Sequence, residues 1–67
     1  MENTKYRFSV RELRVRNGWT QAETAEKLGV STQTYNAWEN DVERLTISKI
    51  KALANILGVS IDEIFLG

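Results

Sequence analysis

Three residue types are missing from this 67-residue sequence: it contains no cysteine, no histidine and no proline. Without cysteine the chain can form neither a disulfide nor a thiolate metal site, so its core alone must stabilise it. Histidine and cysteine are also the side chains that most often act as catalytic bases, nucleophiles and transition-metal ligands. The sequence therefore argues against an enzyme, and we expect no metal, no cofactor and no small-molecule sensor.

Long apolar runs are missing as well. No run approaches the roughly 18 residues of a membrane-spanning helix, and the first residues, MENTKYRFSV, lack the apolar segment of a secretory signal. Hydrophobic residues make up 42% of the chain and charged residues 27%, which is typical of a folded globular protein. We expect one cytoplasmic domain without membrane contact.

An excess of either charge is absent too, since the formal net charge is zero. The charges are nevertheless unevenly distributed along the chain. Residues 1–20 carry five basic and two acidic side chains, whereas residues 21–67 carry four basic and seven acidic ones. This balance argues against a strongly basic nucleic-acid binder, and it predicts a shallow salt dependence for any DNA binding.

The sequence contains many signals for the beginnings and ends of helices. Hydroxyl residues that can cap a helix precede each segment with apolar residues every three or four positions, and glycines follow several of these segments. The capping-box pairs are Ser9 with Glu12, Thr20 with Glu23, and Ser60 with Glu63, while Ser31 and Thr46 can cap alone; the closing glycines are Gly18, Gly29 and Gly58.

These signals predict an all-α domain of five helices. The expected ranges are about 10–17, 21–28, 32–40, 47–57 and 61–66, in a domain spanning 9–67 after a flexible N-terminal arm at 1–8. No segment shows the apolar–polar alternation of a strand.

The stretch TQAETAEKLGVSTQTYNAWEN, residues 20–40, reads as two short helices joined by a tight turn. Counting from Gln21, a small residue stands at the fifth position (Ala25) and a glycine at the ninth (Gly29), so the helices can approach closely and the first can end sharply. With RELRVRNGW before it and LANILGVSIDEIF after it, this stretch resembles the Cro/repressor-like helix-turn-helix family of bacterial and phage regulators, from about Ser9 to Phe65.

The resemblance implies a compact five-helix, lambda-repressor-like fold in which the second and third helices form the DNA-reading unit. It implies a transcriptional regulator, a repressor, that binds a palindromic operator in double-stranded DNA as a homodimer with the third helix in the major groove. The alternative is a protein-interaction module such as an antitoxin or anti-repressor, with a protein partner.

The third helix is expected to bury Tyr35 and Trp38 and to expose its opposite face. The resemblance implies that residues on this face contact bases, and the candidates are Thr32, Gln33, Asn36 and Ala37. Glutamine and asparagine can pair bidentately with adenine, and threonine and alanine can contact a thymine methyl. Phosphate-contact candidates are Gln21, Asn40, Arg44, Thr46 and Lys49. The alternative for the exposed face is a merely solvated surface.

By the same resemblance, Arg14 and Glu39 form an internal ion pair between the first and third helices. Apolar residues near the C-terminus are candidates for a dimer interface, namely Ile56, Ile61, Phe65 and Leu66. The alternative for all four is the core, and we expect Ile64 and Phe65 to be core residues.

Four positions depart from the family pattern. Thr24 stands where leucine is usual, Trp19 and Tyr35 are bulkier than the usual aliphatic residues, and Asp41 replaces the usual glycine after WEN. We expect repacking around the first three residues. The charge of Asp41, near Glu43, would weaken DNA binding.

Overall fold

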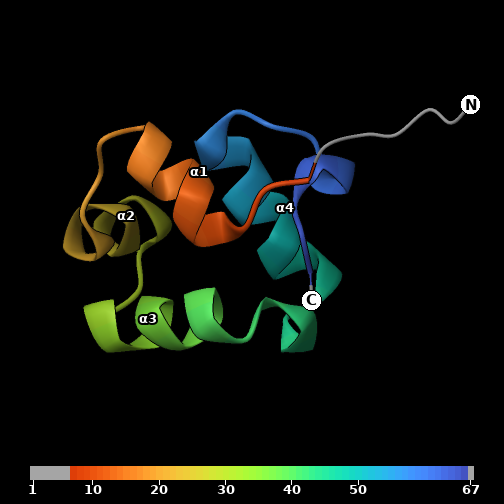
Figure 1. Cartoon of the computed structure of the whole chain (residues 1–67). Helices are drawn as coiled ribbons and strands as arrows, with labels where there is room; N and C mark the ends of the chain where they lie inside the picture. The colour runs from red at the N-terminus through yellow and green to blue at the C-terminus, as the bar shows by residue number, and fades with distance from the viewer. Residues whose placement is uncertain (1–6, 67) are drawn as a thin grey trace, which may run out of the picture.

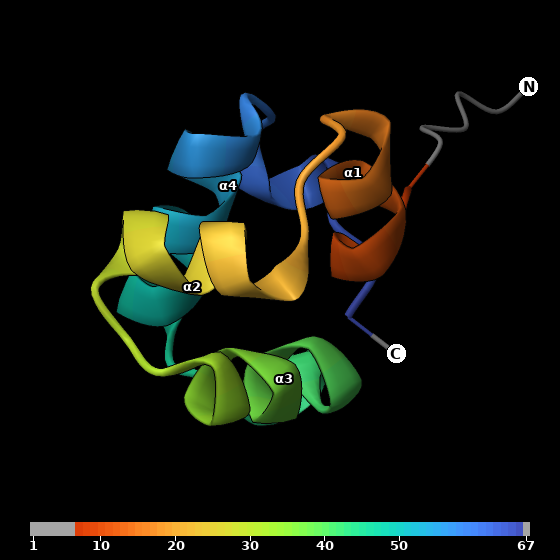
Figure 2. The same ribbon diagram turned by 90° about the vertical axis from the view of Figure 1, so that its left-hand side faces the viewer.

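The computed structural model describes residues 7–66. Over this range the chain forms four α-helices and two single turns of 3₁₀ helix. The helices are α1 (Val10–Arg16), α2 (Gln21–Leu28), α3 (Thr32–Asn40) and α4 (Ile47–Leu57), and the turns are η1 (Val42–Arg44) and η2 (Ile61–Glu63). In Figures 1 and 2, α3 runs along one edge of the molecule, with α2 lying next to it.

The predicted caps define the helix boundaries. At the start of α2, the Thr20 hydroxyl accepts a hydrogen bond from the Glu23 amide at 3.0 Å, and the Glu23 carboxylate accepts one from the Thr20 amide at 2.8 Å. Ser9 and Glu12 form the same capping box on α1. These bonds satisfy amides that lack a partner within the helix, and so they determine where each helix begins.

The expected fifth helix at 61–66 is wrong. The helical conformation ends with η2, and Ile64 has extended backbone angles, φ −93° and ψ 128°. Ile64 instead forms an isolated parallel β-bridge with Phe8: the Phe8 amide donates to the Glu63 carbonyl at 2.9 Å, and the Phe65 amide donates to the Phe8 carbonyl at 2.8 Å. The last three residues of the predicted helix, 64–66, are thus not helical, and the chain there pairs with its own N-terminal segment.

The flexible arm was expected to span residues 1–8. Residues 1–6 lie outside the described residues, while the backbone of Phe8 is tied to the domain by the bridge.

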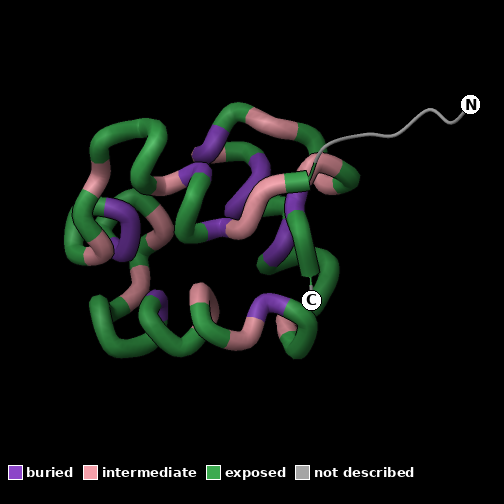
Figure 3. Tube along the Cα trace, viewed as in Figure 1, coloured by how far each residue is buried: buried purple, intermediate pink, exposed green. Residues whose placement is uncertain are grey.

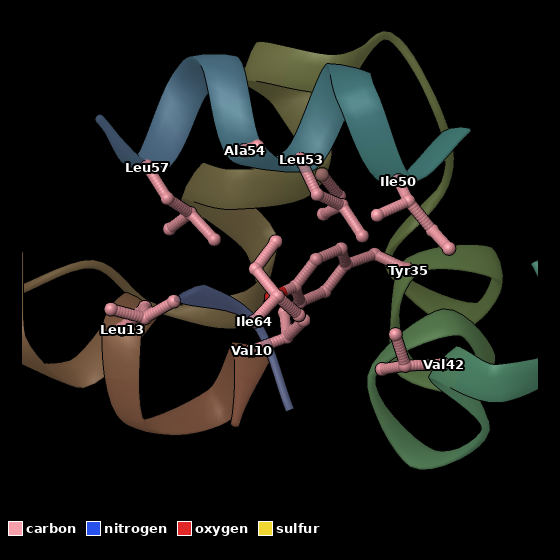
Figure 4. Packing of buried hydrophobic residues seen from close by; sticks show 10 residues of the cluster. Val10, Leu13, Tyr35, Val42, Ile50, Leu53, Ala54, Leu57 and Ile64 are labelled. Atoms are coloured by element: carbon pink, nitrogen blue, oxygen red, sulfur yellow. The ribbon is translucent and has the colours of Figure 1, made fainter. Parts of the chain in front are cut away.

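The core lies between α1, α2, α4 and the inner side of α3. Tyr35 and Leu53 are fully buried, and Figure 4 shows the Tyr35 ring among Leu53, Ile64 and Val10. Among residues 7–66, the buried apolar residues are Val10, Leu13, Ala25, Tyr35, Val42, Ile50, Leu53, Ala54, Leu57 and Ile64. Because all four helices and the C-terminal segment contribute, removal of any one of them would open the core.

The departures at Thr24 and Trp19 are accommodated without an unpaired buried polar atom. Thr24 is fully buried, and its hydroxyl donates to the Thr20 carbonyl, one helical turn earlier, at 2.9 Å. Trp19 is only partly buried at the edge of the core, and Lys27 Nζ lies 4.4 Å from the centroid of its ring. The hydroxyl at position 24 is therefore satisfied locally, as threonine in helices often is.

Phe65 is not a core residue, contrary to the expectation. Its exposed fraction is 51%, and that of Leu66 is 42%, whereas Ile64 is 2% exposed. The reason is the extended backbone after η2, because successive side chains of an extended chain point to opposite sides. Ile56 and Ile61 are partly buried and pack against the core.

Candidate nucleic-acid interface

The turn between α2 and α3 is closed by backbone hydrogen bonds around Gly29. Gly29 has a left-handed conformation, φ +73°, which favours glycine. The Val30 amide donates to the Ala25 carbonyl at 3.0 Å, and the Ser31 hydroxyl accepts from the Thr34 amide at 3.1 Å to begin α3. The angle between the helices is thus held by bonds within the turn and by the buried Ala25.

The outer face of α3 is exposed, as expected. Its exposed residues include all four candidates for base contacts and one candidate for a phosphate contact: Thr32, Gln33, Asn36, Ala37 and Asn40. In Figure 3 most of α3 has the colour of exposed residues, and Tyr35 is the buried residue of this helix. None of the five side chains is charged, so this face offers amide and hydroxyl hydrogen bonds and a methyl group.

Beneath this face, the structure brings Arg14 and Glu39 together. Arg14 Nε donates to Glu39 Oε2 at 2.7 Å, and Arg14 Nη1 donates to the Trp19 carbonyl at 2.8 Å. The two side chains are only 11% and 2% exposed, so this is a largely desolvated ion pair. It joins α1, the loop before α2, and α3.

The ion pair has two further hydrogen-bond donors that the sequence interpretation missed. The Tyr35 hydroxyl donates to Glu39 Oε2 at 2.6 Å, and Gln21 Nε2 donates to Glu39 Oε1 at 2.9 Å. Tyr35 lies four residues before Glu39 on the same helix, so their spacing could have indicated the contact. The Gln21 contact joins two helices and has no comparable signal in the sequence.

The surroundings of Glu39 shift the pKa values of the groups that meet there. Burial alone raises the pKa of Glu39, but the hydrogen bonds from Arg14, Tyr35 and Gln21 outweigh it, and the net pKa lies below the usual value. The hydrogen bond to Glu39 raises the pKa of Arg14. Burial, and then the hydrogen bond to Glu39, raises the pKa of Tyr35. At neutral pH the site therefore contains a carboxylate, a guanidinium and a neutral phenol.

Gln21 connects this buried ion pair to the outer face of α3. Asn36 Nδ2 donates to Gln21 Oε1 at 3.2 Å, and Asn40 Nδ2 donates to Asn36 Oδ1 at 3.1 Å. Two phosphate candidates and one base candidate are thus joined by hydrogen bonds in the free protein.

The remaining phosphate candidates lie at η1 and at the start of α4. Arg44 Nε is 3.1 Å from the Asp41 carboxylate, in a pair whose side chains are 82% and 45% exposed. Thr46 caps α4 through the Lys49 amide at 3.3 Å. Lys49 Nζ lies 5.4 Å from the centroid of the Trp38 ring, which places it beside α3.

The exposed C-terminal residues lie close to the end of α3. Phe65 and Leu66 line one hollow of the surface together with Ser9, Asn40 and Val42. Ile47 and Val15 are also exposed. In residues 7–66 no cluster of acidic side chains could hold a metal ion. The helices of this same range are too short or too polar to cross a membrane.

A family model described as helix-turn-helix matches residues 10–64. The chain therefore belongs to the Cro/C1-type helix-turn-helix family of DNA-binding transcription regulators. Comparison with curated proteins and with solved structures gave no match. Membership of this family assigns to the chain binding of double-stranded DNA and a function in the regulation of transcription.

Proposed function

We propose that this helix-turn-helix protein is a sequence-specific repressor that binds a palindromic operator as a homodimer, with α3 in the major groove. The observation that carries the proposal is the exposed, uncharged outer face of α3 on a turn held by backbone hydrogen bonds. Such a face supplies directional hydrogen bonds at a fixed angle, as readout of base edges requires.

The composition of this face favours A·T base pairs. Gln33 and Asn36 can each donate to adenine N7 and accept from its N6 amino group, and Thr32 and Ala37 can pack against a thymine methyl. Arginine and lysine, the usual partners of guanine, are absent from the five exposed residues of this face. We expect the contacted positions of the operator to be rich in A·T pairs.

Contacts to the DNA backbone would flank the base contacts. Gln21 and Asn40 lie at the two ends of the hydrogen-bonded chain through Asn36, and each retains an amide N–H that can meet a phosphate oxygen. Arg44, Thr46 and Lys49 would contact the backbone from η1 and α4. Only two of these five side chains are cationic, so the electrostatic contribution per subunit is small.

The dimer contact would involve the exposed C-terminal residues. Phe65 and Leu66 share a hollow with Asn40, at the end of α3, and a contact there would determine the distance between the two recognition helices. Ile56 and Ile61 are largely used by the core and would contribute only their exposed edges.

Selection of bound duplexes from a random DNA pool at low salt tests the proposal. We expect a symmetric, A·T-rich motif whose half-sites lie about 10 base pairs apart or a multiple of that. Repeating the selection with Gln33→Ala should relax the preference at one position in each half-site. Recovery of random sequences by the wild-type protein would refute sequence-specific binding.

One observation favours the second candidate, a protein-interaction module such as an antitoxin or anti-repressor. Arg44 is paired with Asp41, so one of the two cationic phosphate candidates is already partly neutralised. If the random pool yields no motif, a search for a protein partner, with Phe65 and Val15 as the exposed apolar residues to mutate, becomes the next experiment.

A further inference from the structure

Three side-chain amides form an unbroken chain from the buried ion pair to the surface of α3. Gln21 Nε2 donates to Glu39 Oε1 at 2.9 Å, Asn36 Nδ2 donates to Gln21 Oε1 at 3.2 Å, and Asn40 Nδ2 donates to Asn36 Oδ1 at 3.1 Å. We refer to Gln21, Asn36 and Asn40 together as the amide relay. Every bond in the relay runs in the same direction, from the surface toward Glu39.

The direction of the relay follows from the chemistry of Glu39. An ionised carboxylate only accepts hydrogen bonds, whereas an amide side chain can donate or accept and can rotate by half a turn. Glu39 is 2% exposed and is held as a carboxylate by Arg14 and Tyr35. Gln21 must therefore turn its nitrogen toward Glu39, which leaves its oxygen for Asn36.

The same constraint passes along the chain to Asn36. Because the Gln21 oxygen accepts, Asn36 must turn its nitrogen inward, and its oxygen then accepts from Asn40. Rotation of any one amide would place two oxygens or two N–H groups against each other. Each polar atom of the Asn36 amide uses one of its two hydrogen-bonding positions in the relay, so one N–H and one lone pair remain for a base.

We propose that Glu39, although buried, is a positioning residue for sequence recognition: through Gln21 it orients the Asn36 amide for adenine before DNA binds. The proposal rests on the proposed function, since it assumes that Asn36 contacts a base. It adds that Gln21 carries sequence information as well as meeting a phosphate. An orientation set in advance spares the cost of ordering a free side chain, which is roughly threefold to tenfold in affinity.

Gln21→Met is the central variant. Methionine has a similar length but no amide, so it breaks the relay while the Arg14 and Tyr35 hydrogen bonds to Glu39 remain. Operator affinity would be measured by fluorescence anisotropy, with each adenine replaced in turn by 7-deazaadenine, which lacks the N7 acceptor. Replacing the adenine that Asn36 contacts should weaken binding by the wild-type protein but not by the Asn36→Ala variant. This difference identifies the adenine.

The expected result is selective. In Gln21→Met, the penalty for 7-deazaadenine at the Asn36 position should fall by roughly threefold to tenfold, while the penalty at the Gln33 position should persist because Gln33 is outside the relay. A uniform loss of affinity, with both penalties retained, would mean that Gln21 contacts only phosphate, and would overturn the proposal. Thermal melts would show whether the variant is folded.

Glu39→Gln tests whether the Glu39 carboxylate sets the direction of the hydrogen bonds in the amide relay. Glutamine can donate as well as accept, so the relay loses its fixed direction and the same selective loss is expected without removal of the Gln21 amide. If this variant does not fold, Gln21→Met still decides the question.

A measurement on the free protein separates this proposal from the proposed function. In ¹⁵N–¹H spectra, the side-chain amide signals of Asn36 and Asn40 should shift on Gln21→Met, and that of Gln33 should not. Unchanged Asn36 signals would overturn the relay. Shifted signals in a protein without sequence preference would instead show that the relay exists and that the proposed function, together with the positioning role, is wrong.

Discussion

Replacement of Arg14 by alanine should be the most damaging single change at the ion pair. The variant removes hydrogen bonds from Arg14 to the Glu39 carboxylate at 2.7 and 3.3 Å and one to the Trp19 carbonyl at 2.8 Å. It leaves a carboxylate that is 2% exposed, with Tyr35 and Gln21 as hydrogen-bond donors and with the exposed Arg11 guanidinium 3.9 Å from its Oε1.

The magnitude follows from the burial of the pair. Removing one partner of a buried ion pair costs about 3–5 kcal/mol. We expect the lower end, about 3 kcal/mol, because two neutral donors and the Arg11 guanidinium still reach Glu39. A 67-residue chain has a free energy of unfolding of roughly 3–10 kcal/mol, so the loss is about 30% of it or more. The melting temperature should fall by roughly 12–24 °C.

Thermal and urea unfolding followed by far-UV circular dichroism would measure this loss. Arg44→Ala is the matched control, since Arg44 pairs with Asp41 at 3.1 Å, but their side chains are 82% and 45% exposed. An exposed pair contributes about 0–1 kcal/mol, so the control should melt within a few degrees of the wild-type protein. If Arg14→Ala loses no more stability than Arg44→Ala, the buried pair contributes no more to the free energy of unfolding than the exposed pair does.

Four further outcomes are expected. Because the pKa of Glu39 is lowered in the folded state, its contribution to stability is complete above its ordinary value of 4.5 and is lost as the pH falls below that value; urea titrations at several pH values should show this loss, and Glu39→Gln should lack it. Gln33→Ala should cost about 1–3 kcal/mol of discrimination at one base pair, measured by competition between operator variants, and an unchanged preference would remove Gln33 from the base readers. The logarithm of the association constant of a dimer should fall against the logarithm of salt concentration with a slope of roughly −4, from two cationic side chains per subunit, and a slope near −10 would indicate further phosphate contacts. Phe65→Asp should shift the dimer toward monomer in sedimentation equilibrium, and a wild-type protein that is monomeric at all concentrations would exclude the homodimer.

The four α-helices could be predicted because their boundaries depend on neighbours in the sequence. A capping hydroxyl acts on an amide three residues away, as Thr20 does on Glu23, and Gly29 ends α2 by its own conformational freedom. The same signals at Ser60 and Glu63 predicted a fifth helix that the structure does not contain. There the outcome depends on Phe8, more than 50 residues away, whose pairing with Ile64 competes with helix formation.

The candidate site likewise has features that could be predicted from the sequence and features that could not. Exposure of Gln33 and Asn36 followed from the helical period once Tyr35 was placed in the core. The hydrogen bonds that Asn36 makes could not be read from the sequence, because Gln21 and Glu39 are brought within reach only by the packing of α2 on α3.

The sequence by itself determined the four α-helices, the turn between α2 and α3, and which face of α3 meets solvent, because caps, glycines and apolar periodicity act over a few residues. Only the tertiary structure decided that Phe65 turns outward, and that Tyr35 and Gln21 join Arg14 and Glu39 at one buried point. The physical reason is that burial and hydrogen bonding between helices depend on where the chain places residues that are distant in sequence. Local propensity depends only on near neighbours and so cannot predict that placement.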